Sequence, residues 1–252
     1  MDESAGKNKR LRQQNEKDIE RDKNMRTIGL IGGMSWESTI PYYRIINEEV
    51  KKKMGGLHSA KIILYSVEFD EIEKCQSENR WEESGEILGK AAQALETAGA
   101  DFILICTNTM HKVAPQIASM IKVPIIHIAT ADELDKARIK RVGLLGTKYT
   151  MTQDFYKKRL VDRGIDVLIP KESEIETVNS IIFNELCVGT ITEESRKKFQ
   201  DIIEKLKEKG ADGVILGCTE IGLLISQSDV SIPVFDTTVI HAKRAAKIAM
   251  ED

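Results

Sequence analysis

Three sequence motifs occur twice in the chain, in the same order, and this duplication constrains the fold more than any other feature. The pairs are IGLIGGM (28–34) and VGLLGTK (142–148), AGADFILICTNT (98–109) and KGADGVILGCTE (209–220), and KVPIIHI (122–128) and SIPVFDT (231–237). The second copies follow the first by 114, 111 and 109 residues, counted from Gly29, Gly99 and Pro124. Three matches at nearly one spacing indicate a tandem duplication of one folding unit.

The repeated unit has the pattern of an α/β fold. TIGLIGG, KIILYSV, FILICT and PIIHIA are short, nearly continuous apolar runs, which are typical of parallel strands buried on both faces. WESTIPYYRIINEEVKKKM and RWEESGEILGKAAQALETAGA lie between them and have helical spacing of apolar residues. We therefore predict two similar three-layer domains, each a parallel, Rossmann-like sheet covered by helices.

The duplication also predicts the domain boundaries. We expect a charged N-terminal extension at 1–24, a first α/β domain at 25–130 and a second at 131–236. A C-terminal helix at 237–252 is expected to pack back onto the first sheet and complete the first domain. Because parallel α/β sheets bind ligands outside the carboxyl ends of their strands, we place the active site in the cleft between the two domains.

The composition limits which binding partners and which cellular location we expect. The chain has 252 residues and a formal net charge of −3, which gives no reason to expect binding to nucleic acid or to an anionic membrane. It has no apolar run near the ~18 residues needed to cross a bilayer and no signal peptide, so we predict a cytoplasmic protein without a membrane partner. Its four cysteines form no C-x-x-C pair, and we predict neither metal nor a disulfide framework.

Two reactive segments end predicted strands, one in each half. CTNT (106–109) and GCTE (217–220) would lie on opposite walls of the cleft. Matching groups on both sides suit the inversion of a stereocentre, in which one face of a carbon loses a proton and the other gains one. Cysteine can act as the base because its thiol pKa, about 8.5, can be shifted toward neutrality.

These residues resemble the aspartate/glutamate/hydantoin racemase superfamily, and within it the aspartate racemase and broad-specificity amino-acid racemase branch. The resemblance runs from about residue 26 to the C-terminus and rests on IGLIGGM, GADFILICTNTMH, GCTE and IPVFDT. It implies catalysis without pyridoxal phosphate or another cofactor, without metal, and with one acid/base cysteine from each domain. It also implies an amino-acid substrate and a homodimer.

The resemblance places Cys218 at the second catalytic position. Alignment of CTNTMH (106–111) with the family's CNTAH places Thr107 at the first, and Cys106 falls one residue earlier. Adjacent strand residues point to opposite faces, so we expect Cys106 in the domain core. Three alternatives follow: Thr107 shuttles a proton, Cys218 works alone, or Cys106 reaches the cleft through a bulge. We favour the first, because the rest of the racemase pattern is intact.

The resemblance also predicts how the substrate is held. Aspartate-specific relatives grip the side-chain carboxylate with two cations, whereas this chain has Ile72 and Glu176 near those positions. A neutral or broader range of amino acids is therefore expected. Glu68 is expected at the pocket floor. The other expected substrate-binding residues, around the α-carboxylate and amine, are Met34, Ser35, Asn108, Thr109, Thr147, Thr150 and Thr219.

The sequence thus predicts a cofactor-independent amino-acid racemase with broad or non-aspartate specificity. Two alternatives stay open: a one-base isomerase, lyase or decarboxylase of the same fold, and a non-catalytic amino-acid-binding protein. Two neighbours of the site have two interpretations each. His111 either tunes the cleft or packs, and Glu220 either orients the site or starts a helix. His58, His127 and His241 show no constellation and are expected to be structural or exposed.

Overall fold

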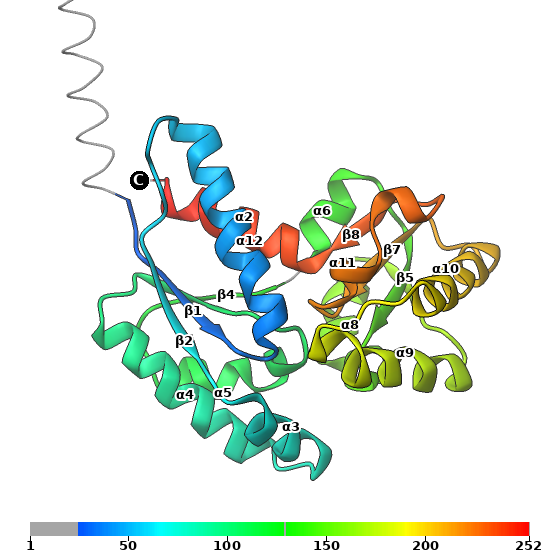
Figure 1. Cartoon of the computed structure of the whole chain (residues 1–252), viewed down its shortest axis with the longest axis horizontal. Coiled ribbons are helices and arrows are strands. Elements are labelled where there is room, and N and C mark those ends of the chain that lie inside the picture. The colour runs from blue at the N-terminus through cyan, green and yellow to red at the C-terminus, as the bar shows by residue number, and fades with distance from the viewer. Residues whose placement is uncertain (1–24, 129, 252) are drawn as a thin grey trace, which may run out of the picture.

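The computed structural model describes residues 25–128 and 130–251. The predicted charged extension, 1–24, lies outside the described residues. Two four-stranded sheets lie side by side in Figure 1, each with helices on both faces. Every strand pair in both sheets is parallel. The predicted fold class is therefore confirmed.

The first sheet takes the strand order β2-β1-β3-β4. Its half of the chain contains, in sequence order, β1 (Ile28–Gly32), α2 (Trp36–Met54), β2 (Ile62–Ser66), α3 (Phe69–Ser77), α4 (Trp81–Thr97), β3 (Phe102–Ile105), the 3₁₀ helix η1 (Thr109–Val113), α5 (Ala114–Ser119) and β4 (Ile125–Ile126).

The second sheet has the equivalent order, β6-β5-β7-β8, which fits a duplicated unit. Its elements are α6 (Ala131–Lys136), β5 (Arg141–Gly146), α7 (Lys148–Thr152), α8 (Asp154–Val161), β6 (Asp166–Leu168), α9 (Glu172–Asn184), η2 (Leu186–Val188), α10 (Glu193–Glu208), β7 (Gly213–Gly217), α11 (Ile221–Leu224), η3 (Gln227–Asp229) and β8 (Val234–Asp236). The helix α12 (Thr237–Ala249) follows β8.

Strand residues alternate between two apolar layers in the first half. Phe102 and Leu104 of β3 pack on the layer that contains α2 and α12, whereas Ile103 and Ile105 pack on the layer that contains α4 and α5. This alternation is the period-2 geometry of a strand with both faces buried. The same alternation determines which side chains after β3 point into the core and which do not.

The last helix crosses back from the second sheet to the first. Figure 1 shows α12 beside α2, on the same face of the first sheet. The α12 side chains at this contact are small, and the α2 side chains are larger, among them Tyr42 and Ile46. Small side chains on one helix let the two helix axes approach closely. The buried alanines of α12 are Ala242, Ala245, Ala246 and Ala249.

Among the described residues, no helix is both long enough and apolar enough to cross a membrane.

The α2–α12 contact generates a stability prediction. Ala246→Leu adds three carbons to a fully buried position, and overpacking of this kind costs about 1–3 kcal/mol. For a chain of this size that corresponds to a melting temperature lower by about 2–4 °C per kcal/mol, measurable by thermal unfolding. Lys247→Ala, at the neighbouring exposed position, should change the melting temperature little. Equal melting temperatures for Ala246→Leu and the wild type would contradict the close packing of α2 and α12.

Candidate active site

Thr107 and Cys218 occupy equivalent places at the carboxyl ends of the two central strands. Cys218 follows β7 directly, and Thr107 lies two residues beyond β3. Thr107 stands 111 residues before Cys218, the same offset that relates Gly99 to Gly210. Both side chains are nearly enclosed, with 8% and 7% of their surface exposed. The structure therefore gives the two predicted acid/base residues matching positions in the two halves.

Cys106 points away from Thr107. It continues the Phe102 and Leu104 face of β3 and is fully buried in the layer that contains α2 and α12. Burial raises the pKa of the Cys106 thiol far above its usual range, which disfavours the thiolate. The prediction that Cys106 lies in the core is confirmed, and the alternative in which a bulge turns it into the cleft is not what the structure shows.

Glu220 is the carboxylate around which the site is built. Its Oε2 accepts hydrogen bonds from Cys218 Sγ at 2.9 Å and from Thr219 Oγ1 at 3.0 Å. Its Oε1 accepts from the backbone N–H of Ser35 at 3.0 Å and from Ser35 Oγ at 2.9 Å. Ser35 is the N-cap of α2, so a residue of the first half holds a carboxylate of the second. The positive end of the α2 dipole also favours a carboxylate there.

The thiol of Cys218 is held in its protonated form. Burial raises its pKa well above the usual value, and the nearby Glu220 carboxylate raises it further. The hydrogen bond to Glu220 gives the proton a defined acceptor at 2.9 Å. Cys218 therefore can donate a proton directly, and it becomes a base when its proton passes to Glu220.

Asn108 leaves one buried acceptor free. The Thr237 hydroxyl donates to the Leu216 carbonyl at 2.8 Å, so it can only accept from Asn108, which assigns Nδ2 to that 2.9 Å bond. Asn108 Oδ1 then has no partner among the described residues, although it is buried. A buried amide oxygen without a donor costs free energy unless a ligand supplies one.

Three threonine hydroxyls join the two halves beside Asn108. Thr109 Oγ1 lies 2.9 Å from Thr147 Oγ1, which lies 3.2 Å from Thr150 Oγ1. Thr147 is also the N-cap of α7, where its side chain accepts from the Thr150 backbone N–H. All three are buried, so the structure brings these predicted residues together.

Met34 and Glu68, two further residues predicted to bind substrate, have different surroundings. Met34 is buried in an apolar cluster that also contains Ile72 and Met110. Glu68 is exposed, and its carboxylate caps α3 by accepting from the Glu71 backbone N–H at 2.9 Å. Glu68 therefore does not join the buried hydrogen-bond network, whereas Met34 contributes an apolar surface next to Ser35.

A histidine cluster lies directly behind Thr107. His111 Nδ1 donates to the Thr107 carbonyl at 2.8 Å, because its Nε2 accepts from the Ile128 backbone N–H at 3.2 Å. The His111 ring lies 4.3 Å from the His127 ring and 5.9 Å from the His241 ring, measured between centroids. The sequence does not predict this cluster, since the three histidines come from η1, the end of β4 and α12.

Burial keeps all three rings neutral. It lowers the pKa of His111 to about 4, of His241 to about 3 and of His127 to about 2. His241 is fixed by the Tyr42 hydroxyl at 2.9 Å and the Ile126 carbonyl at 2.8 Å. A neutral His111 can hold the Thr107 backbone in place without competing for its hydroxyl.

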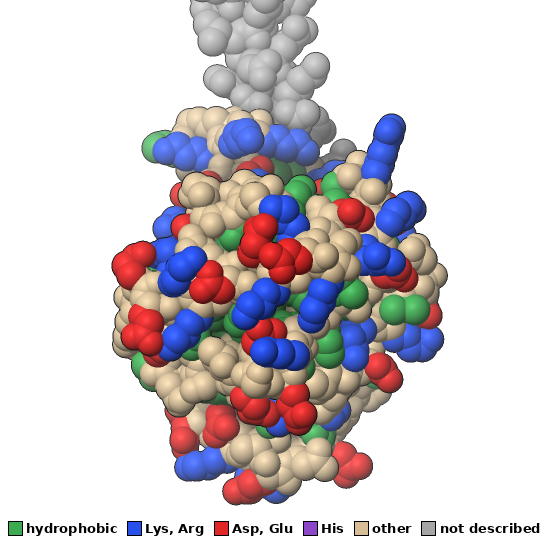
Figure 2. Space-filling view, turned by 90° about the vertical axis from the view of Figure 1, so that its right-hand side faces the viewer, with side chains coloured by type: hydrophobic (Ala, Val, Ile, Leu, Met, Phe, Trp, Pro, Cys, Tyr) green, Lys and Arg blue, Asp and Glu red, His purple; other side chains and the backbone are tan. Residues whose placement is uncertain are grey.

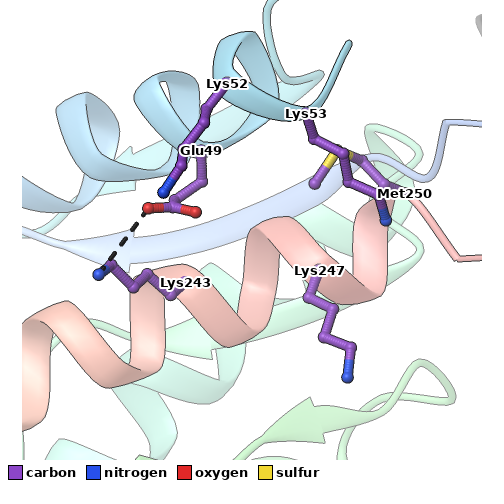
Figure 3. Close-up of a pocket in the computed structure, with 6 residues that line it drawn as sticks. All are labelled: Glu49, Lys52, Lys53, Lys243, Lys247 and Met250. Atoms are coloured by element: carbon purple, nitrogen blue, oxygen red, sulfur yellow. Dashed lines mark ion pairs between the residues drawn. The ribbon is translucent and has the colours of Figure 1, made fainter.

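A groove at the far end of α2 is not part of this site. Figure 3 shows it between α2 and α12, with Glu49 and Lys243 paired at 3.8 Å. Ser35 and Thr237 of the site lie at the N-terminal ends of these two helices, whereas the groove lies near their C-terminal ends. The 19 residues of α2 span about 28 Å at 1.5 Å per residue, which separates the two places. The other residues that line the groove are Lys52, Lys53, Lys247 and Met250.

No group of three histidine, cysteine, aspartate or glutamate side chains in the described part of the chain could hold a metal ion.

The histidine cluster generates a pH prediction. The folded pKa values lie below the ordinary value near 6.5, so the unfolded chain takes up protons first as the pH falls. The unfolding free energy should therefore fall between pH 6.5 and pH 4, by about 1.4 kcal/mol per pH unit for each histidine. Urea unfolding across this range measures the slope.

A matched pair of variants isolates the cluster from the carboxylates. His127→Phe removes one of the three titrating rings and should flatten the pH dependence, whereas His58→Phe, outside the cluster, should leave it unchanged. Parallel slopes for His127→Phe and the wild type would show that the ring is not kept neutral by the fold.

The Glu220 carboxylate generates a second prediction. Glu220→Gln retains an acceptor for Ser35 but removes the negative charge that raises the pKa of Cys218. The pH at which a small alkylating agent modifies Cys218 should therefore move lower, as measured by peptide mass spectrometry that separates Cys218 from the other thiols. Glu193→Gln, at an exposed position of α10, is the control. An unchanged or higher pH would contradict the contact between thiol and carboxylate.

Comparison with known proteins gives a consistent result. The Asp/Glu/hydantoin racemase family model matches residues 31–245. The broad-specificity amino-acid racemase RacX of Bacillus subtilis is 26% identical over 231 residues, which are 86% of this chain and 95% of RacX.

Solved structures extend the comparison. A candidate Asp/Glu racemase from Yersinia pestis is 53% identical, with a TM-score of 0.83, and the match covers 90% of this chain and 100% of that one. An aspartate racemase homologue from Pyrococcus horikoshii is 41% identical, with a TM-score of 0.78 and the same coverage. The family model spans most of the chain, and both of these structures match over their full length. The chain belongs to the Asp/Glu/hydantoin racemase family.

Proposed function

We propose that the protein is an amino-acid racemase that works without pyridoxal phosphate and inverts the Cα stereocentre with Cys218 and Thr107. The observation that carries the proposal is the buried Glu220 carboxylate, which contacts the Cys218 thiol and is held from the other half by Ser35. Family membership supports the reaction class, since RacX is described as a broad-specificity amino-acid racemase.

The proton transfers follow from the two strand ends. When Cys218 acts as the base, its proton passes from Sγ to Glu220 Oε2, and the thiolate takes the Cα proton. The Cα–H bond breaks, an S–H bond forms, and the electron pair is left on the substrate. The Thr107 hydroxyl then gives its proton to the opposite face of Cα. Water reprotonates the threonine, and the hydroxide so formed is neutralised by the proton held on Glu220, which restores both side chains.

The two directions are chemically unequal. Within the part of the chain that the structure describes, no side chain hydrogen-bonds to the Thr107 hydroxyl, whereas the Cys218 thiol has a carboxylate partner. A hydroxyl is a much weaker base than a thiol. We therefore propose that Thr107 acts more readily as the acid, so that the enantiomer whose Cα proton faces Cys218 has the higher kcat. Its KM is then higher in the same proportion, because the equilibrium constant of a racemisation is 1.

The substrate would be anchored by groups that have free hydrogen-bonding capacity. Asn108 Oδ1, a buried acceptor without a partner, suits the α-ammonium group. The Thr109, Thr147 and Thr150 hydroxyls and the Thr219 backbone can donate to the α-carboxylate, which also gains charge as the proton leaves.

The side chain of the substrate is proposed to be neutral, or variable as in a broad-specificity enzyme. Ile72 is fully buried in the apolar cluster with Met34, so it offers no charge to a distal carboxylate. Glu176 is already paired with Lys148. A missing charge-assisted hydrogen bond of this kind costs about 1.5–3 kcal/mol of binding.

The wider setting is also proposed. We infer that the two sheets mark two domains, 25–130 and 131–236, and that 237–252 completes the first. We also infer that the protein is cytoplasmic. Its proposed partners are an amino acid and a second copy of the chain. The supporting observations are the two separate sheets, the return of α12 to α2, and the absence of a membrane-spanning helix among the described residues.

The experiment is a turnover assay on single enantiomers of a panel of amino acids, without added cofactor, followed by chiral chromatography. We expect inversion of neutral amino acids, and aspartate turned over at least about 10-fold more slowly, which corresponds to about 1.4 kcal/mol. Cys218→Ser and Thr107→Ala should each lower the inversion rate by at least about 100-fold. Cys106→Ser, which changes the core cysteine, is the matched control and should retain activity.

Two outcomes would change the proposal. Inversion that survives Thr107→Ala would favour a one-base isomerase that uses Cys218 alone, whereas release of a changed carbon skeleton would favour the lyase or decarboxylase. An amino acid that raises the melting temperature without being turned over would favour the non-catalytic binding protein.

A further inference from the structure

One buried amide beside the candidate active site lacks a strong hydrogen-bond partner. Gln76, near the end of α3, has only 4% of its surface exposed. Its Nε2 donates to Met110 Sδ at 3.1 Å, which is the only hydrogen bond of this side chain among the described residues. A thioether sulfur accepts weakly and cannot donate, so the nitrogen faces it and Oε1 is left without a donor.

The surroundings of this amide are apolar. Ile72 stands one turn earlier on the same face of α3, and both Ile72 and Met110 belong to one buried apolar cluster. A methionine or leucine would pack there with no polar group to satisfy, whereas a buried polar group without a partner costs about 1–3 kcal/mol. An amide at such a place is accounted for if a ligand supplies the missing hydrogen bonds.

Polar side chains on the outside of the molecule are in a different situation. Figure 2 shows lysine, arginine, aspartate and glutamate interspersed over the face of the second half, with apolar side chains only in small separate spots. Water satisfies polar groups at such a surface. It cannot do so for a side chain as enclosed as Gln76.

Gln76 lies where the two halves meet at the threonine hydroxyls. Met110, which its amide contacts, directly follows Thr109. From the second half, the Tyr149 hydroxyl donates to the Gln76 carbonyl at 3.2 Å, and Tyr149 stands two residues after Thr147. The Thr109 and Thr147 hydroxyls are themselves 2.9 Å apart. The amide is thus flanked from both halves by neighbours of residues that we propose bind the substrate.

Aromatic side chains pack at the same junction. The Tyr149 ring meets the Trp81 ring edge-on, with 5.3 Å between centroids, and both side chains are half-buried. Lys112 Nζ lies 3.7 Å from the centroid of the Trp81 ring. This packing limits the access of water, and a hydrogen bond is stronger where water does not compete for it.

We propose that the Gln76 amide binds the side chain of the substrate, and that the preferred substrates carry a side-chain carboxamide. Gln76 Oε1 accepts an N–H of the substrate amide, and the second N–H of Nε2 donates to the substrate carbonyl oxygen. A carboxylate cannot supply the donor that Oε1 requires, and an apolar side chain supplies neither group. The proposal rests on the proposed racemase function and narrows its substrates from neutral to carboxamide side chains.

The test compares substrates of one shape. Asparagine and leucine branch at the same carbon, so the ratio of their kcat/KM values reports on the amide, and glutamine extends the comparison by one carbon. For the better of asparagine and glutamine, we expect kcat/KM at least about 10-fold above that of leucine. Gln76→Met keeps the length of the side chain and should abolish this preference. Gln93→Met, at an exposed position of α4, is the matched control and should retain it.

Two results would overturn the proposal: leucine turned over as well as both amides by the wild type, or a preference for the amides that Gln76→Met leaves unchanged. The backbone carbonyl, not the side chain, makes the bond to Tyr149, so Gln76→Met should fold with an unchanged or higher melting temperature.

Calorimetric titration with the same amino acids repeats the comparison without turnover. We expect the dissociation constants of the wild type to favour an amide over leucine, and those of Gln76→Met not to. Binding that keeps this difference while no amino acid is inverted would count against the racemase and not against the role of Gln76. Equal dissociation constants in the wild type would overturn the role of Gln76.

Discussion

The structure depends on a buried carboxylate that neither half of the chain could satisfy alone. Glu220 belongs to the second half, yet two of the four hydrogen bonds that it accepts come from the N–H and hydroxyl of Ser35 in the first. A buried carboxylate without a cation is costly unless hydrogen bonds replace the lost water. Here the donors and the N-terminal end of α2 supply that replacement, so closing the two halves on each other and forming the site are one event.

Duplication explains the similarity of the two strand ends, and divergence explains their chemistry. At the end of β7 the chain has a thiol next to a carboxylate, whereas at the end of β3 it has a hydroxyl whose backbone is held by a neutral His111. The fold supplies two matching positions, after β3 in the first half and after β7 in the second. The side chains at those positions make the two proton transfers unequal, which a symmetric pair of thiols would not.

The fold and part of the site follow from local sequence features. The motif repeat and the apolar runs predict both parallel sheets. The alternation along β3 predicts that Cys106 is buried in the layer that contains α2 and α12, and that Thr107 does not belong to this layer. These inferences succeed because strand periodicity and repeat spacing are properties of neighbouring residues.

Contacts between residues far apart in the sequence could not be predicted in the same way. Ser35 and Glu220 are 185 positions apart, and the three clustered histidines come from different elements. Nothing local in the chain indicates that Asn108 Oδ1 is left without a donor, because that depends on the direction in which the Thr237 hydroxyl points.

The central claim is that Cys218 and Thr107 work on opposite faces of one carbon, and the fate of a solvent proton tests it most directly. Each enantiomer would be incubated in deuterium oxide for a small fraction of one conversion, and the Cα proton of the recovered substrate and of the product measured by NMR. If two separate groups carry the protons, the product should contain deuterium and the recovered substrate should keep protium. The reason is that the group that gives a proton to the product has exchanged with solvent. Deuterium in the recovered substrate as fast as in the product would mean that one group serves both faces, and would contradict the account.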